Sequence, residues 1–183
     1  MFAKNILRRL ANSAVVAFVA AVLYVFITPW YRQGEPIAAK KAEDFPLTVA
    51  GNQTRLSAFR GKVVVLNLWA SWCGSCVEEM PDLDRLQARI RSRGGIVLAV
   101  SVDENCGNYE DFLKKYPVRF STACDPTNKV PLDYLYSGPL DDGQIPETYI
   151  IDREGRIVRR VIGPQQWDSA AMNAYFDSIL SAS

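Results

Sequence analysis

The most reactive side chains of this 183-residue sequence are four cysteines, because the chain has no histidine. The lack of histidine excludes Ser-His-Asp and Cys-His catalysis, Cys₂His₂ zinc sites and iron sites that depend on histidine ligands. Two of the cysteines, Cys73 and Cys76, form a C-x-x-C pair in the segment WCGSC. Two thiols at this spacing can close a disulfide or exchange it with another protein. The sequence therefore indicates thiol chemistry.

The C-x-x-C pair falls where a strand is expected to end and a helix to begin. The apolar run 63–69 predicts a strand buried on both faces, and residues 74–92 have the apolar spacing of a helix. Amide groups at a helix N-terminus stabilise a thiolate, so we expect the pKa of the Cys73 thiol to be lowered. This makes Cys73 the expected nucleophile and Cys76 the resolving thiol. The alternative, half of a zinc site, lacks a second close pair of ligands, so we expect no metal and no cofactor.

The rest of the chain predicts the elements that must hold this pair. A hairpin is expected over residues 45–56, turning at Gly51-Asn52. Further strands are expected over 96–102, 119–123, 148–151 and 156–162, and further helices over 107–116, 130–136 and 167–181. The apolar face of the last helix is expected to contain Ala171, Tyr175, Ile179 and Leu180. The order favours an α/β fold with a central, mostly parallel sheet flanked by helices, an N-terminal β-hairpin and an inserted helix and strand.

The overall composition is that of a globular domain without a charged field. Hydrophobic residues make up 49% of the chain, which is enough to bury a core. Lys and Arg total 21 and Asp and Glu total 20, for a net charge of +1. This balance provides no basic surface for nucleic acid, so we expect no nucleic-acid partner.

Residues 1–30 predict a transmembrane anchor. Three basic residues precede an uncharged, mainly apolar stretch, 10–31, which as a helix would be about 33 Å long and would cross a bilayer core of about 30 Å. The basic flank should stay in the cytoplasm, which puts the rest of the chain on the periplasmic side. The alternatives are a cleaved signal peptide, which gives the same compartment and allows disulfides to persist, and a buried soluble helix. We expect a linker over 31–44 and a folded domain over 45–183.

The segment LNLWASWCGSC, residues 66–76, resembles the W-C-x-x-C active-site segment of thioredoxin-like proteins. It is most similar to the membrane-tethered TlpA/ResA/CcmG (DsbE) group. Three further segments resemble that group in the same order: FRGK at 59–62, SVD at 101–103 and IPETYIID at 145–152. Together they cover roughly residues 44–180. The resemblance implies a thioredoxin-like fold and a thiol–disulfide oxidoreductase that acts on other extracytoplasmic proteins.

The resemblance also implies a substrate-binding surface around the C-x-x-C pair. In this family the proline that matches Pro146 has a cis peptide bond and faces the cysteines. Ile145 could then pair through its main chain with a bound substrate segment. The alternative for Pro146 is an ordinary trans proline that opens a strand. Trp72 is expected to cover the disulfide and contact partners, with core packing as the alternative.

Two acids are implied to tune the thiols. Glu79 lies three residues after Cys76 on the expected helix, and a buried carboxylate there could exchange a proton with Cys76 and raise nearby thiol pKa values. The alternative is a solvated helix charge, as we expect for the adjacent Glu78. Glu147, in a P-E-T segment similar to that of the cytochrome c biogenesis branch, could act in the same sense or be a plain surface carboxylate.

The other two cysteines depart from the common pattern of this group. Cys106 follows the second strand and Cys124 ends the third, and neighbouring parallel strands end about 5 Å apart. Disulfides need Cα separations of about 4.4–6.8 Å, so a bridge fits. We expect a structural disulfide; a second redox pair that relays electrons to Cys73–Cys76, or unpaired thiols, are the alternatives.

The favoured function is that of an enzyme that reduces protein disulfides, as in cytochrome c maturation or metal-site assembly. Its expected partners are a cysteine-containing extracytoplasmic protein and a membrane electron donor that re-reduces the pair. A copper chaperone on the same fold is the alternative, although chaperones of this kind use a distal histidine. A peroxidase on this fold would need a Thr-x-x-Cys arrangement, which is absent.

Overall fold

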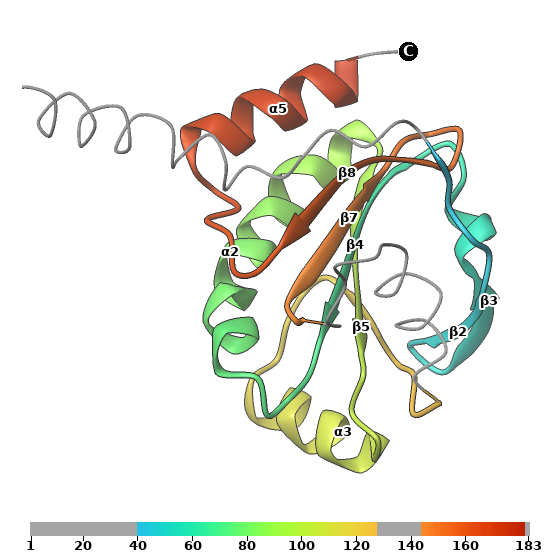
Figure 1. The fold of residues 1–183 in the computed structure, drawn as a ribbon, viewed down its shortest axis with the longest axis vertical. Helices are drawn as coiled ribbons and strands as arrows, with labels where there is room; N and C mark the ends of the chain where they lie inside the picture. Colours follow the sequence, from blue (N-terminus) through green and yellow to red (C-terminus); the bar gives the residue numbers. More distant parts are fainter. Residues whose placement is uncertain (1–39, 128–143, 182–183) are drawn as a thin grey trace, which may run out of the picture. The chain divides into compact units, whose positions relative to one another are not determined.

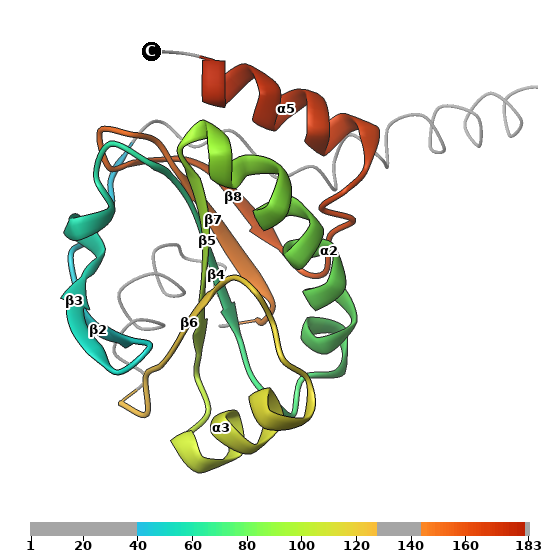
Figure 2. The ribbon, with the colours of Figure 1, turned by 180° about the vertical axis from the view of Figure 1, so that it is seen from behind.

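The computed structural model describes residues 40–127 and 144–181 (Figures 1 and 2), all within the compact unit Gly34–Ser183. Its centre is a six-stranded sheet in the order β1-β8-β7-β4-β5-β6. The strands of this sheet are β1 (Lys40–Lys41), β4 (Val63–Trp69), β5 (Gly95–Ser101), β6 (Ser121–Cys124), β7 (Glu147–Ile151) and β8 (Arg156–Ile162). The helices are α2 (Gly74–Ile90), α3 (Cys106–Lys115) and α5 (Ala170–Ser181), with short 3₁₀ turns η1 (Leu56–Phe59) and η2 (Arg91–Arg93). The predicted anchor, 1–30, and the predicted helix over 130–136 lie outside the described residues.

The sheet is mixed rather than mostly parallel, which corrects the prediction. Strands β4, β5 and β6 run parallel, but β7 pairs antiparallel with β4, and β8 and β1 continue in antiparallel fashion. The physical reason is the hairpin that joins β7 to β8, since two strands joined by a tight turn must run in opposite directions. Because β7 is also antiparallel to β4, neither of its two pairings is parallel.

Strand β4 separates two apolar clusters, because alternate side chains of a strand point to opposite faces. Val63 and Val65 pack in the cluster that α2, α3 and α5 cover, while Val64, Leu66 and Leu68 pack against the hairpin side. All seven residues of β4 are buried, as its continuous apolar run predicts. Figures 1 and 2 show α2 and α5 on one face of the sheet and the hairpin on the other. The C-x-x-C pair therefore follows a fully buried strand.

The N-terminal hairpin is confirmed, with its turn one residue earlier than predicted. Strands β2 (Pro46–Val49) and β3 (Asn52–Arg55) pair with Val49 opposite Asn52, which leaves Ala50 and Gly51 as the turn. Both turn residues have positive φ, 49° and 78°. Two positive φ values are what a two-residue type I′ turn requires, and glycine adopts them without steric cost.

The start of the folded unit differs from the prediction. The predicted linker 31–44 reaches into the folded unit, because β1 pairs with the edge strand β8, and Ala42 is buried and donates its N–H to the carbonyl of Gly155. An edge strand offers unpaired backbone groups, which explains why the short segment joins it.

The buried face of α5 is only partly as predicted. The fully buried residues are Met172, Phe176 and Leu180, while Tyr175 and Ile179 are partly buried against the same apolar cluster. Ala171 is exposed, so the prediction is wrong there. Apolar residues occur on α5 in adjacent pairs, so helix periodicity alone does not decide which member of a pair is buried more deeply.

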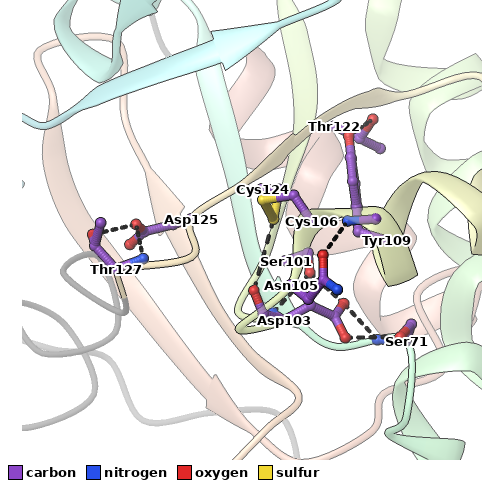
Figure 3. The surroundings of a disulfide bond; sticks show 11 residues. Ser71, Ser101, Asp103, Asn105, Cys106, Tyr109, Thr122, Cys124, Asp125 and Thr127 are labelled. Atoms are coloured by element: carbon purple, nitrogen blue, oxygen red, sulfur yellow. Dashed lines mark hydrogen bonds between the residues drawn. A yellow bond between two sulfur atoms is a disulfide. The ribbon is translucent and has the colours of Figure 1, made fainter.

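The second cysteine pair is closed as a disulfide. Cys106 begins α3, Cys124 ends β6, and their sulfurs are 2.07 Å apart with a Cα separation of 5.8 Å (Figure 3). The parallel register places Cys124 opposite Ser101 at the end of β5, which confirms that the two strand ends are neighbours. The bond ties α3 to the edge of the sheet, and it excludes the alternative of unpaired thiols.

Replacing Gly95 by alanine is expected to lower the free energy of unfolding by about 1–3 kcal/mol, the usual cost of overpacking a core. Gly95 begins β5, and a Cβ there would lie 2.7 Å from the Cβ of Ile90 and 2.8 Å from its Cγ1. Chemical denaturation measures the effect. Gly74→Ala is the control, since a Cβ at Gly74 meets nothing within 4 Å. Equal losses of stability in the two variants would contradict the expected clash.

Candidate active site

The C-x-x-C pair lies at the N-terminus of α2 and is closed as a disulfide. The sulfurs of Cys73 and Cys76 are 2.07 Å apart, and their Cα atoms are 5.3 Å apart. Cys73 is the N-cap residue of α2, and its Sγ accepts a hydrogen bond of 3.2 Å from the backbone N–H of Cys76. Cys73 is 7% exposed and Cys76 is 1% exposed. The outer sulfur is therefore that of Cys73, and the helix directs an N–H at it.

A second loop, next to the neighbouring strand, meets the disulfide. The Ile145–Pro146 peptide bond is cis, which excludes the trans alternative, and the carbonyl oxygen of Ile145 lies 3.9 Å from the Sγ of Cys73. Pro146 directly precedes β7, the antiparallel neighbour of β4. This pairing explains the meeting, because β4 ends where β7 begins. The loop before β7 and the loop after β4 therefore share one edge of the sheet.

Two exposed apolar side chains flank this edge. Trp72 is 70% exposed, so it does not pack in the core. Ile162 is 54% exposed at the end of β8, opposite Glu147 in the register, and the next residue, Gly163, donates its N–H to the carbonyl of Pro146. We did not predict Ile162 from the sequence as part of this surface. Its position shows only in the strand register, since an isoleucine at the end of a strand is ordinary in sequence.

Glu79 is buried, at 4% exposure, and not a solvated helix charge. Its Oε1 accepts a hydrogen bond from Asn67 Nδ2 (2.8 Å), and its Oε2 accepts from the N–H of Gln165 (3.0 Å) and from Trp167 Nε1 (3.1 Å). Burial raises the pKa of Glu79 to about 7, although these three donors act to lower it. The carboxyl group can therefore be either protonated or ionised near neutral pH.

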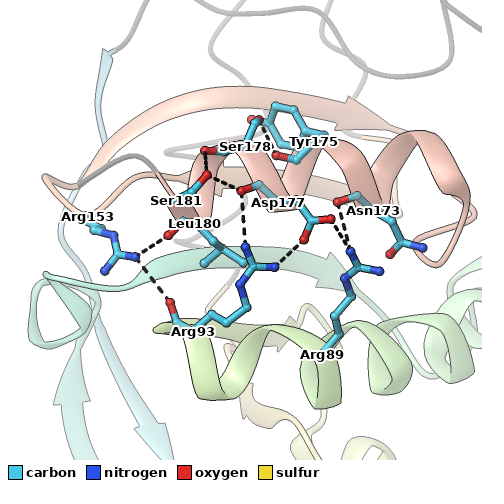
Figure 4. Close-up of polar contacts among 9 residues, drawn as sticks. All are labelled: Arg89, Arg93, Arg153, Asn173, Tyr175, Asp177, Ser178, Leu180 and Ser181. Atoms are coloured by element: carbon cyan, nitrogen blue, oxygen red, sulfur yellow. Dashed lines mark hydrogen bonds and ion pairs between the residues drawn. The ribbon is translucent and has the colours of Figure 1, made fainter.

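The loop that covers Glu79 is held by the packing of α5 against α2. Gln165 and Trp167 precede α5, and Trp167 is fully buried. Figure 4 shows Arg89 and Arg93 of α2 and η2 both meeting Asp177 of α5. These ion pairs are more than one third exposed, so they orient the helix more than they stabilise it.

Asn67 is a site residue that we did not predict from the sequence. It is 1% exposed in the middle of β4, and its Nδ2 also donates to Thr148 Oγ1 on β7 (2.9 Å). It thereby connects Glu79 to the strand that follows the cis proline. The signal in the sequence was an asparagine within an apolar strand, because a buried polar side chain needs a hydrogen-bond partner.

Glu147 is also buried, at 1% exposure, so it is not a plain surface carboxylate. Its Oε1 accepts a hydrogen bond from the Tyr149 hydroxyl (2.7 Å) and pairs with Arg160 Nε. A guanidinium that contacts a carboxylate offsets its charge. The described donors to Glu79 are neutral, whereas Glu147 is paired with a guanidinium.

These features define a class of protein: a thioredoxin-like domain with a disulfide-bonded C-x-x-C pair beside a cis proline. Comparison with known proteins gives the family. Residues 38–160 match the model of the AhpC/TSA family, and the chain belongs to this family. Within the described residues, no group of three or more Cys, Asp or Glu side chains is arranged to hold a metal ion.

The similar proteins share this redox chemistry. The chain is 32% identical to the thiol-disulfide oxidoreductase ResA of Bacillus cereus over 69% of its length and 70% of that protein. It is 32% identical to ResA of Geobacillus kaustophilus over 83% of its length and 85% of that protein. A crystal structure of a candidate DsbE-type thiol:disulfide interchange protein from Chlorobium tepidum is 31% identical, with a TM-score of 0.71, and covers 80% of this chain and 100% of that one. The chain is thus a thiol–disulfide oxidoreductase of the ResA/CcmG group.

Proposed function

We propose that the chain is a membrane-anchored, extracytoplasmic reductant of protein disulfides, of the type used in cytochrome c maturation or metal-site assembly. The observation that carries the proposal is the Cys73–Cys76 disulfide at the start of α2, with the carbonyl of Ile145 beside the outer sulfur. The anchor rests on the uncharged stretch 10–31. Among the described residues, no helix is long and apolar enough to cross a bilayer.

The proposed reaction begins with the reduced pair. The thiolate of Cys73 attacks a disulfide of the substrate, which forms a mixed disulfide and releases one substrate thiolate. Cys76, as thiolate, then attacks the Cys73 sulfur, which frees the second substrate thiol and closes the Cys73–Cys76 bond. The N–H of Cys76 that now donates to Cys73 Sγ would stabilise the thiolate of Cys73. A membrane donor supplies two electrons and two protons to restore the dithiol.

Glu79 is the proposed acceptor of the Cys76 proton. It lies three residues after Cys76 on α2, and both side chains are buried on the same side of the helix. A general base works best when its pKa is close to the working pH, and the pKa of Glu79 is raised to about 7. Glu147 is proposed to tune the site more weakly, because Arg160 pairs with it.

The proposed substrate surface is formed by Trp72, Ile145 and Ile162. Trp72 and Ile162 offer exposed apolar area, while the main chain of Ile145 can bond to an extended segment as an added strand. Such a surface uses main-chain bonds and apolar contact, so it suits an extended cysteine-containing segment of another protein. The identity of the side chains around the substrate cysteine would matter less.

The reduction potential of the Cys73–Cys76 pair tests the direction of the reaction. We expect a value below about −200 mV, towards the roughly −270 mV of thioredoxin, because buried acids near the thiols disfavour the thiolate and so favour the disulfide. The full-length protein is equilibrated with glutathione buffers, and the fraction of Cys73–Cys76 disulfide is counted by alkylation and mass spectrometry. A potential near −120 mV, typical of a strong oxidant, would overturn the assignment as a reductant.

A further inference from the structure

A buried carboxylate that the proposed reaction does not use holds the loop in front of Cys73. Asp103, 1% exposed, lies just after β5. Its Oδ2 accepts the N–H of Ser71 (3.0 Å) and its Oδ1 accepts the Ser71 hydroxyl (2.7 Å). Ser71 is two residues before Cys73. Both hydrogen-bond donors of this loop residue are therefore bound to one side chain from a neighbouring strand end.

Asp103 is itself fixed by its own segment. The Ser101 hydroxyl donates to Oδ2 of Asp103 (2.6 Å) and accepts the N–H of Asp103 (3.0 Å). The N–H of Val102 donates to the carbonyl of Trp69 at the end of β4 (2.8 Å). The carboxylate therefore joins a network in which the ends of β4 and β5 cannot move independently.

The Cys106–Cys124 disulfide closes this network on its outer side (Figure 3). Cys106 lies three residues after Asp103, and the Sγ of Cys124 lies 3.8 Å from the carbonyl oxygen of Asp103. On the β6 side, the N–H of Asp125 donates to the carbonyl of Ser101 (2.8 Å). The short segment that carries Asp103 is thus bound covalently to β6 at one end and is continuous with β5 at the other.

We propose that Asp103 is a positioning residue for the Cys73–Cys76 pair, and that the Cys106–Cys124 disulfide is the brace that holds Asp103 in place. The second disulfide then has a role in the chemistry of the first without exchanging electrons with it. This inference rests on the proposed thiol–disulfide exchange at Cys73 and Cys76. In this role the Cys106–Cys124 disulfide is neither a purely structural bond nor an electron relay.

The direction of the effect follows from ring closure. A loop that holds two thiols close together favours their disulfide over mixed disulfides with glutathione, because the second thiol attacks at high effective concentration. Releasing Ser71 from Asp103 loosens the loop and lowers that concentration. The Cys73–Cys76 disulfide then becomes easier to reduce.

The test compares the equilibrium of the Cys73–Cys76 pair with glutathione in the full-length protein and three variants. Asp103→Asn is expected to lower the equilibrium constant for disulfide formation about tenfold, equal to roughly 30 mV for this two-electron couple. Ser71→Ala removes one of the two bonds, and Cys106→Ala/Cys124→Ala removes the brace, so each should shift the constant in the same direction by a smaller factor. The matched control is Asp111→Asn on α3, whose exposed carboxylate pairs with Lys114 instead.

The outcomes separate the inference from the function on which it rests. Asp111→Asn should stay within about twofold of wild type, since changes to exposed side chains outside the network are small. Asp103→Asn should add little once the brace is removed, because groups in one network are not additive. The wild type could exchange with glutathione while Asp103→Asn and Ser71→Ala leave the equilibrium constant for disulfide formation unchanged. That result would refute the inference and leave the proposed function intact. Ser71→Ala decides the question if Asp103→Asn does not fold. A wild type that does not exchange would refute the proposed function.

Discussion

Replacing Cys73 by serine is expected to reduce the protein-disulfide reductase activity to the uncatalysed background, whereas Cys76→Ser should stop the reaction as a trapped mixed disulfide. The thiolate is the nucleophile in exchange, and a serine hydroxyl does not replace it at neutral pH. Without Cys76 the first attack can still occur, but nothing resolves the bond formed at Cys73. The two variants should therefore fail at different steps, and this difference gives the order of attack.

Both steps can be measured on one substrate. Turnover is followed by the reduction of a disulfide-bonded protein in the presence of a chemical electron donor, and the trapped complex by non-reducing gel electrophoresis and mass spectrometry. The Cys106→Ser/Cys124→Ser variant is the control, because it also lacks a disulfide but keeps the C-x-x-C pair and should still turn over. A mixed disulfide that formed on Cys76 in the Cys73→Ser variant would reverse the assigned roles.

The same Cys76→Ser variant distinguishes the copper-chaperone alternative. A chaperone would bind Cu(I) through Cys73 and Cys76 without reducing protein disulfides, and either substitution would remove one of its ligands. A trapped complex with another protein is not expected of such a site. Capture of a mixed disulfide through Cys73 in the native membrane would also identify the protein substrate.

Replacing Glu79 by glutamine is expected to abolish a loss of stability that the wild type shows as pH rises. The pKa of Glu79 is raised to about 7 in the folded protein, above its ordinary value of 4.5, because the carboxyl group is buried. A raised carboxyl pKa contributes stability that is fully present below the unfolded value and is lost as pH rises through the folded value. Between pH 5 and pH 8.5 the wild type should lose about 2–3 kcal/mol that Glu79→Gln does not lose.

The local contacts allow this substitution. All three described partners of Glu79 donate to it, so a glutamine oxygen can keep the bonds from Gln165 and Trp167. Its NH₂ group would then face Asn67, whose side-chain amide must turn to present its oxygen. Urea unfolding at several pH values measures the effect, and Glu78→Gln is the control on the exposed side of α2. Parallel pH profiles for wild type and Glu79→Gln would show that Glu79 does not titrate in this range.

Glu79→Gln should also slow the second step of exchange near neutral pH, because the proposed proton acceptor is lost. The first step, attack by Cys73, should change less. Rapid mixing with a disulfide-bonded peptide separates the two steps, since the mixed disulfide accumulates when resolution is slow. This kinetic pattern differs from a general loss of stability, which would slow both.

Local patterns in the sequence were sufficient for most of the site. The C-x-x-C pair, the strand before it and the helix after it are adjacent in the chain, so helix and strand periodicity predicted their arrangement. The cis bond before Pro146 came from the resemblance to a family and is confirmed. The predicted face of α5 is correct only in part, because its apolar residues occur in adjacent pairs and the neighbouring elements decide which member of each pair is buried more deeply.

By itself, the sequence determined which chemistry is possible: with no histidine and a C-x-x-C pair at a helix start, the reactive atoms had to be sulfur. The tertiary structure alone decided which distant groups surround them. Asp103, Asn67 and Ile162 reach the site through the pairing of β5, β7 and β8 with their neighbours, and strand pairing depends on contacts between segments far apart in the chain. The pairing and register of these strands depend on which side chains are buried on each face of the whole sheet. A local sequence pattern does not carry that information.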